Sequence, residues 1–201
     1  MTTALLSTTY FGPVQWYQKL CRYPQTLIER HESYVKQTYR NRCLIATAQG
    51  VQALTVPVVH EGPGDISSIR ISDHGNWRHL HWQAITSAYG DSPFLEFYED
   101  DLRSFFADSQ WEYLIDFNET ICRKMCELLD IHPSIAETSH YDVTGDFVDF
   151  RQAIHPKHPE ADCEFVPRPY YQVFSQRHGF LPRLSILDLL LNMGPESICF
   201  L

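Results

Sequence analysis

The sequence predicts a mixed α/β (α+β) protein of one domain, residues 1–201, with a small mixed or antiparallel sheet over residues 1–72 and a helical remainder over residues 73–201. Short apolar and β-branched runs, separated by turn residues, are concentrated before residue 72 and are typical of strands. From about residue 76 onward, apolar residues recur at spacings of three and four, which indicates helices. An apolar content of 44% and a charged content of 20% are those of a globular chain with a full hydrophobic core.

The N-terminal region is expected to contain one early helix packed on several strands. The helix should cover Val14–Cys21. The expected strands are Gln25–Glu29, Arg42–Thr47, Gln52–Val59 and the short Ser68–Ile71. Because Ala48-Gln49-Gly50 is a tight connection, the second and third of these strands should form a hairpin.

Four helices are expected in the remainder. The first runs from Asn76 to Tyr89 with Asn76 or Asp73 as N-cap, and the second, with Pro93 at its first turn, from Phe94 to Phe106. The third covers Gln110–Leu129, and the last covers Leu184–Met193 before a Gly-Pro stop. Between them, residues 139–168 have no clear periodicity, apart from short extended pieces at 146–150 and 163–167, and their length predicts a functional lid or mobile segment.

Charge and targeting features restrict the function classes. A net charge of −9 argues against a general nucleic-acid binder, because phosphate neutralisation requires a basic face. No run approaches the ~20 apolar residues of a membrane span, and the N-terminus lacks the basic and apolar regions of a signal peptide, so we expect a cytoplasmic protein without a membrane span. The six cysteines include no CxxC pair, and Cys122 and Cys126 read as reduced core residues one helical turn apart.

The stretch from Ile71 to Gly90 holds three histidines and two tryptophans, and it is the first candidate site. On a helix, His79 and His81 point about 160° apart, so one metal ion is not expected to bind both. His81 falls within an apolar arc that includes Trp77, Leu80 and Trp82. It is either a buried neutral histidine, hydrogen-bonded to Asn76 or a backbone carbonyl, or a general acid or base in a cleft under the loop that contains His74.

A basic cluster around Arg40 is the second candidate. Strand alternation puts Arg40 and Arg42 on one face and Asn41 on the other, with Lys36 and Tyr34 close by in the sequence. Two arginines on one face predict a clamp for phosphate, pyrophosphate or carboxylate, and the alternative is a solvated strand edge paired to surface acids.

Two further segments have both a functional and a structural interpretation. Tyr10 opens an aromatic run that could stack on a base or sugar ring, or could dock an N-terminal helix into the core. Ser185 and Asp188 could contact a substrate, or could serve as the N-cap and first-turn acid of the last helix. No GxSxG, Walker A or GxGxxG motif is present, so the sequence specifies no cofactor.

Taken in order, these blocks resemble the WbqC-like protein family. The matching positions are Tyr10-Phe11, Tyr34, Arg40-Asn41-Arg42, Thr55-Val56-Pro57-Val58, Ile85–Pro93 and Phe180–Asp188. Thr8-Thr9 stands where the family has Gln-Pro, and the compact segment 140–168 replaces a longer insert, as in a shortened bacterial branch. The resemblance implies a protein of surface-polysaccharide or O-antigen gene sets and implies no particular reaction.

Two hypotheses follow for the function. In the first, the chain is a group-transfer enzyme acting on a nucleotide-sugar or another anionic small molecule. Its anion would be held by Arg40, Arg42 and Lys36, its ring would pack on Tyr10, Trp77 and Tyr34, and its proton would be moved by His81 or His79. In the second, the chain is a non-catalytic binding or scaffold protein of a polysaccharide-biosynthesis complex. Convergence of the histidines and arginines on one pocket would favour the first hypothesis.

Overall fold

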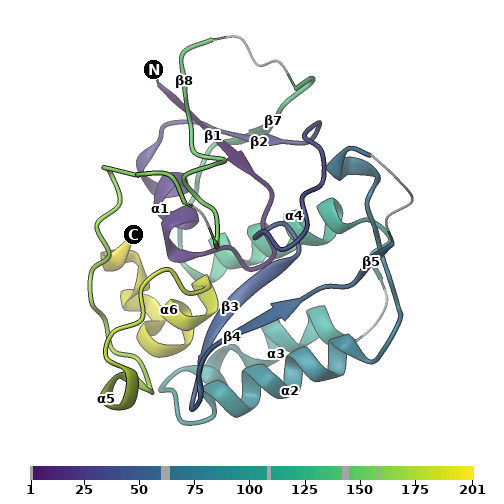
Figure 1. Cartoon of the computed structure of the whole chain (residues 1–201). Coiled ribbons are helices and arrows are strands. Elements are labelled where there is room, and N and C mark those ends of the chain that lie inside the picture. The colour runs from purple at the N-terminus through teal and green to yellow at the C-terminus, as the bar shows by residue number, and fades with distance from the viewer. Residues whose placement is uncertain (1, 60–63, 108–109, 142–144, 158) are drawn as a thin grey trace.

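A parallel sheet forms one side of the structure, which is a computed structural model that describes residues 2–59, 64–107, 110–141, 145–157 and 159–201 (Figure 1). Its described strands are ordered β7-β2-β1-β8. They comprise β1 (Thr3–Ser7), β2 (Thr26–Glu29), β7 (Ile135–Glu137) and β8 (Phe147–Asp149). β1 pairs in parallel with both β2 and β8, and β2 pairs in parallel with β7.

The prediction of a mixed α/β protein is confirmed, and the parallel sheet also includes strands from outside residues 1–72. Two of its strands, β7 and β8, come from beyond residue 130, and β8 lies within the extended piece expected at 146–150. β1 escaped prediction because its three central residues, Ala4, Leu5 and Leu6, are all buried. A strand of a parallel sheet covered on both faces has no apolar-polar alternation by which to recognise it.

Two antiparallel pairs lie beside this sheet. The expected hairpin is present, with β3 (Arg42–Thr47) paired to β4 (Gly50–Thr55). The strand expected over Gln52–Val59 is interrupted, because Pro57 has no amide hydrogen to donate to a ladder. Val58–Val59 forms a separate strand, β5, which pairs with β6 (Arg70–Ile71) after a short 3₁₀ turn at Ile66–Ser68 (η1).

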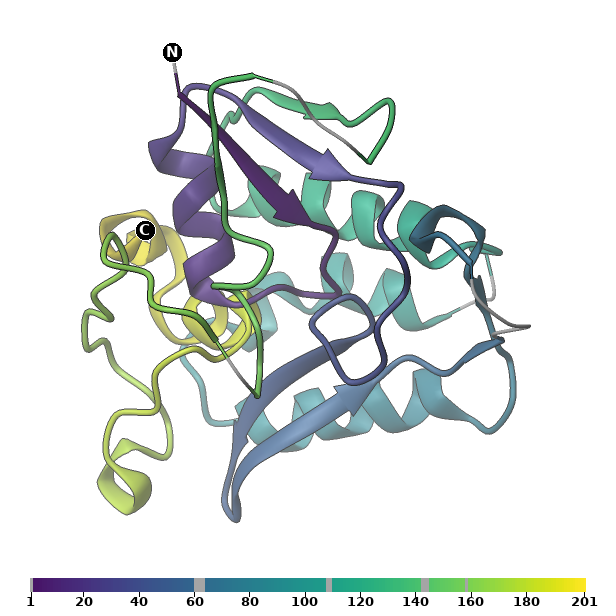
Figure 2. The same cartoon turned by 45° about the horizontal axis from the view of Figure 1, so that its top comes forward.

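The helices expected from the sequence are present, with shifts at their ends. They are α1 (Val14–Arg22), α2 (Trp77–Tyr89), α3 (Leu95–Ala107), α4 (Leu114–Leu128) and α6 (Ile186–Met193). A short helix, α5 (Ser175–His178), precedes α6, and a 3₁₀ segment, η2 (Gly194–Phe200), follows it. The α4 helix begins four residues later than expected. Its buried face includes Leu114, Phe117, Ile121 and Met125. The α2 and α3 helices lie side by side, below the hairpin in Figure 1 and behind it in Figure 2, where α4 lies behind β1 and β2.

The described part of the segment 139–168 is attached to α1 through buried charges. The Lys19 ammonium group lies 2.9 Å from the Asp162 carboxylate, and both side chains are buried. Gln15 also donates a hydrogen bond to Asp162, at 2.7 Å. The extended piece expected at 163–167 forms no strand, and it begins in a turn in which the Phe165 amide donates to the Asp162 carbonyl.

Candidate functional site

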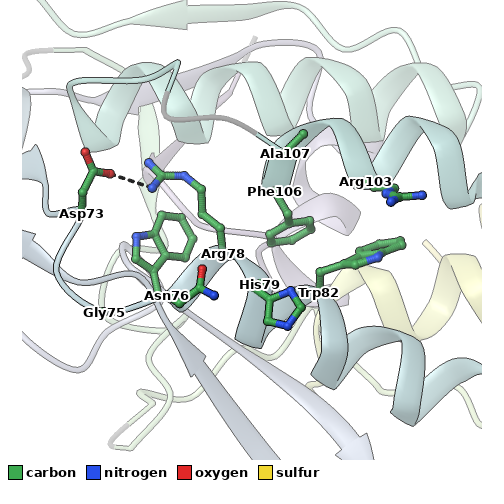
Figure 3. A pocket seen from close by; sticks show the side chains of 10 residues that line it. Asp73, Gly75, Asn76, Arg78, His79, Trp82, Arg103, Phe106 and Ala107 are labelled. Atoms are coloured by element: carbon green, nitrogen blue, oxygen red, sulfur yellow. Dashed lines mark hydrogen bonds and ion pairs between the residues drawn. The ribbon is translucent and has the colours of Figure 1, made fainter.

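A pocket of about 800 Å³ opens between the first turn of α2 and the last turns of α3 (Figure 3). The loop before α2 contributes Asp73, Gly75 and Asn76. The α2 helix contributes Trp77, Arg78, His79 and Trp82, and α3 contributes Arg103, Phe106 and Ala107. We call this cavity the α2–α3 pocket.

Arg78 brings buried hydrogen-bonding groups to this pocket that have no partner among the described residues. Its Nη1 donates to Asp73 Oδ1 at 2.6 Å, and its guanidinium lies 4.5 Å from the centroid of the Trp77 ring. Its Nε and Nη2 are buried and have no hydrogen-bond partner among the described residues. Because an unsatisfied buried donor is costly, these two N–H groups remain available to a hydrogen-bond acceptor.

The surroundings of Arg78 favour a negative ligand. Arg103 gives the lining a second arginine, so with one acid, Asp73, the lining carries one net positive charge on a chain whose net charge is −9. The Asn76 side chain caps no amide of α2, so the positive end of the helix dipole contributes at the same wall. The exposed His79 supplies an imidazole on this wall, and Trp82 supplies a flat ring beside Phe106 (Figure 3).

His81 lies beneath this pocket, not in it. Its Nδ1 is 2.9 Å from the Tyr10 hydroxyl, and its ring packs against Trp77 and Phe106, which line the pocket. Burial lowers the pKa of His81 to about 4, against the opposing effect of a hydrogen bond to the Thr55 backbone. The imidazole is therefore neutral near pH 7, which matches the interpretation of a buried histidine bonded to a backbone carbonyl. Leu80, expected in the same apolar arc, is instead 59% exposed.

The basic cluster around Arg40 is brought together, but not as an open anion clamp. Arg40 is buried and forms a bidentate ion pair with Glu32, with further hydrogen bonds to Thr38 and Ser7. Its guanidinium is therefore engaged by an internal carboxylate, whereas the sequence left open a ligand anion or pairing to acids at the surface.

The remaining members of this cluster have separate roles. Asn41 hydrogen-bonds Tyr34 and donates to the Val56 carbonyl at 2.9 Å. Arg42 donates to Thr55 across the hairpin, and Lys36 is exposed. None of these four residues lines the α2–α3 pocket.

Three further predicted residues have structural positions. Ser185 caps α6 by accepting from the Leu187 amide and donates to the Phe11 carbonyl at 2.7 Å. Asp188 is fully buried and accepts from Tyr89, Tyr170 and Gln172, while burial raises its pKa. His74 is exposed in the loop before α2, between two residues that line the pocket.

The structure thus places some of the predicted residues in the pocket and others outside it. Asn76, Trp77 and His79 line the α2–α3 pocket, whereas Tyr10 and His81 are buried below it and Arg40 belongs to an internal ion pair. Sequence reasoning missed Arg78, Trp82, Arg103 and Phe106 as pocket residues. The mixture of charged and aromatic residues in α2 was a usable signal for Arg78 and Trp82, but α3 has no comparable pattern for Arg103.

Two other classes of site find no support in the described ranges. No cluster of three or more histidine, cysteine, aspartate or glutamate side chains suited to a metal ion occurs there. Likewise, no helix there has both the length and the apolar character needed to cross a bilayer.

Comparison with known proteins places most of the chain in one family. The model of the WbqC-like protein family matches residues 8–158. A protein of Mycobacterium tuberculosis, described as uncharacterised (Rv1507c), is 25% identical over 219 aligned positions, which cover 96% of this chain and 94% of the relative. No solved structure matches the chain.

Proposed function

The chain belongs to the WbqC-like protein family, and from this membership and the α2–α3 pocket we propose that it binds an anionic small molecule, with a nucleotide-sugar as the leading candidate. The proposal rests on two buried guanidinium nitrogens of Arg78 that have no partner in the described part of the chain, at a pocket that also holds Arg103. A pyrophosphate offers several acceptor oxygens to two arginines, and Trp82 offers a face to a base or sugar ring.

The chemical step assigned to this ligand is group transfer from an activated sugar in surface-polysaccharide biosynthesis. His79 would donate or accept the proton, because it is the histidine on the pocket wall whose imidazole is exposed. His81 takes no part in the step, because its two nitrogens are engaged by Tyr10 and the Thr55 backbone.

A non-catalytic binding or scaffold role is the second candidate. It is favoured by one observation, which is that His79, His81, Arg40 and Arg42 do not converge on a single pocket. The two candidates share the ligand and differ in whether His79 changes it. Incubation with the bound nucleotide-sugar and a mixture of acceptors, followed by mass analysis, separates them, because transfer should be lost in His79→Gln while binding is retained.

The binding proposal is tested by calorimetry with UDP-glucose, related nucleotide-sugars and inorganic pyrophosphate. Arg103→Gln should weaken binding about tenfold or more, because a charge-assisted contact contributes roughly 1.5–3 kcal/mol. Arg70→Gln is the matched control, since Arg70 is exposed, pairs with Glu112 and lies outside the pocket. Absence of binding by every anion tested, or equal binding by Arg103→Gln and the unmodified chain, would contradict the proposal.

A further inference from the structure

A second pocket, of about 440 Å³, opens where the carboxyl ends of β1 and β2 meet α4. Thr8 and Thr9 directly follow β1, Arg30 directly follows β2, and Glu137 ends β7, and all four line it. In open sheets of parallel strands, ligands bind outside the carboxyl ends of the strands. We call this cavity the sheet-edge pocket. It shares no lining residue with the α2–α3 pocket.

The wall beside α4 contains an unsatisfied acceptor. Asn118 is buried, and its Nδ2 donates to the Arg40 carbonyl at 2.8 Å and to Thr8 Oγ1 at 3.2 Å. This fixes the orientation of the amide, because the Arg40 carbonyl can only accept. Asn118 Oδ1 then has no donor among the residues that the structure describes. Thr9 Oγ1 is also buried and also has no hydrogen-bond partner among the described residues.

The charges of the sheet-edge pocket are internally balanced. Arg30 pairs with Glu137 at 2.6 Å, and Arg123 pairs with Glu119. All four line the cavity, so its formal net charge is zero. A charged ligand would have to compete with these existing pairs, whereas an uncharged ligand would not.

The rest of the wall is apolar. Trp16, Ile28 and Ile135 contribute side chains from α1, β2 and β7, and Ile115 contributes one from α4. A ring with apolar C–H faces would bury surface against these residues, and its donors would reach the unsatisfied oxygens.

We propose that the sheet-edge pocket is a second binding site, for an uncharged ring-bearing ligand whose hydroxyl or amide groups donate to Asn118 Oδ1. This site is independent of the α2–α3 pocket, because the rings of Tyr10 and Phe117 pack together between the two pockets. On one side, these rings contact His81 and Trp77. On the other side, Phe117 is next to Asn118 along α4.

The test uses two matched probes, phenyl β-glucoside, which is neutral, and phenyl β-glucuronide, which adds one carboxylate to the same scaffold. Saturation-transfer NMR on the full chain should show binding of the glucoside and at least tenfold weaker binding of the glucuronide. Ile135→Trp, which fills the pocket from its 39%-exposed edge position, should abolish the signal. Cys122→Met, which adds volume from α4, is a second blocking variant, and thermal unfolding of each variant checks that it folds.

Arg103→Gln should leave glucoside binding unchanged, so that failure at this pocket and failure at the α2–α3 pocket are distinguishable. The proposal is overturned if the glucoside gives no signal, if a folded blocking variant binds it as the unmodified chain does, or if the glucuronide binds equally well.

Discussion

His81 lies beneath the candidate site and packs against two of the residues that line it. It occupies a buried position of α2, in line with Trp77 and Ile85, where an apolar residue would ordinarily pack. Its polar atoms are satisfied by Tyr10 and the Thr55 backbone, so the imidazole links the N-terminal aromatic run, α2 and the hairpin. A neutral histidine in this position stabilises the floor of the α2–α3 pocket without entering it.

This arrangement predicts a defined pH dependence of stability. Because the pKa of His81 is lowered to about 4 in the folded chain and is about 6.5 when unfolded, the unfolded chain binds the proton first as the pH falls. The stabilisation is complete above pH 6.5 and is lost between pH 6.5 and 4, by about 2 kcal/mol at pH 4.5.

Urea unfolding at pH 7 and pH 4.5 measures this loss. His81→Gln should show a loss smaller by about 2 kcal/mol, because glutamine does not titrate. The raised pKa of Asp188 has the opposite effect, because it makes the folded chain more stable relative to the unfolded chain as the pH falls. This effect is the same in His81→Gln and in the unmodified chain, so it cancels when their losses are compared. The control is His132→Gln, which removes an exposed histidine and should retain the full loss. An equal loss in His81→Gln and the unmodified chain would show that His81 is not the group responsible.

Among the helices and strands, those of sufficient length and regular pattern were predictable. α2 and α3 are thirteen residues each and begin and end within two residues of the expected positions. β7 has three residues and α5 has four, too few for a period to be recognised. The lining of the α2–α3 pocket was predictable only in part. Asn76 and His79 lie in one patterned stretch of the sequence, whereas Arg103 comes from another helix. Only the packing of α2 against α3 brings Arg103 to them.

The α1 helix provides a prediction about the segment that follows β8. Lys19 is fully buried, pairs with Asp162, and lies 4.3 Å from the centroid of the Phe150 ring. Lys19→Met should leave Asp162 buried without its cation, at a cost of about 3–5 kcal/mol, and should release residues 159–168 from α1.

Limited proteolysis with thermolysin, followed by mass analysis, should therefore show faster cleavage between residues 150 and 170 in Lys19→Met. The control is Arg22→Gln, since Arg22 is exposed on α1 and donates a hydrogen bond to the Glu164 carbonyl of the same segment. Cleavage that starts elsewhere, or at the same rate in both variants, would mean that the Lys19 pair does not hold the segment.

The chain as a whole is joined by contacts that cross from the sheet to the helices. One cluster of buried side chains includes Leu6 of β1, Tyr89 of α2 and Leu187 of α6. Polar contacts follow the same route, because Arg40, just before β3, binds Ser7 at the end of β1 and Glu32 after β2. The sequence left Arg40 with two interpretations, a ligand anion or surface acids, because no pattern in the chain indicates that Glu32 reaches it from eight residues away.

These contacts predict that residues 1–201 unfold as one cooperative unit. Urea transitions followed by far-ultraviolet circular dichroism and by tryptophan fluorescence should coincide, since Trp16 lies in α1 and Trp77 lies in α2. Arg40→Met should lower the free energy of unfolding by about 3–5 kcal/mol, because it leaves the Glu32 carboxylate buried and unpaired, and should shift both signals together. Arg123→Gln, which removes an exposed pair, should cost less than about 1 kcal/mol. Separate transitions, or a shift in only one signal for Arg40→Met, would show instead that the parallel sheet and the α2–α3 region fold independently.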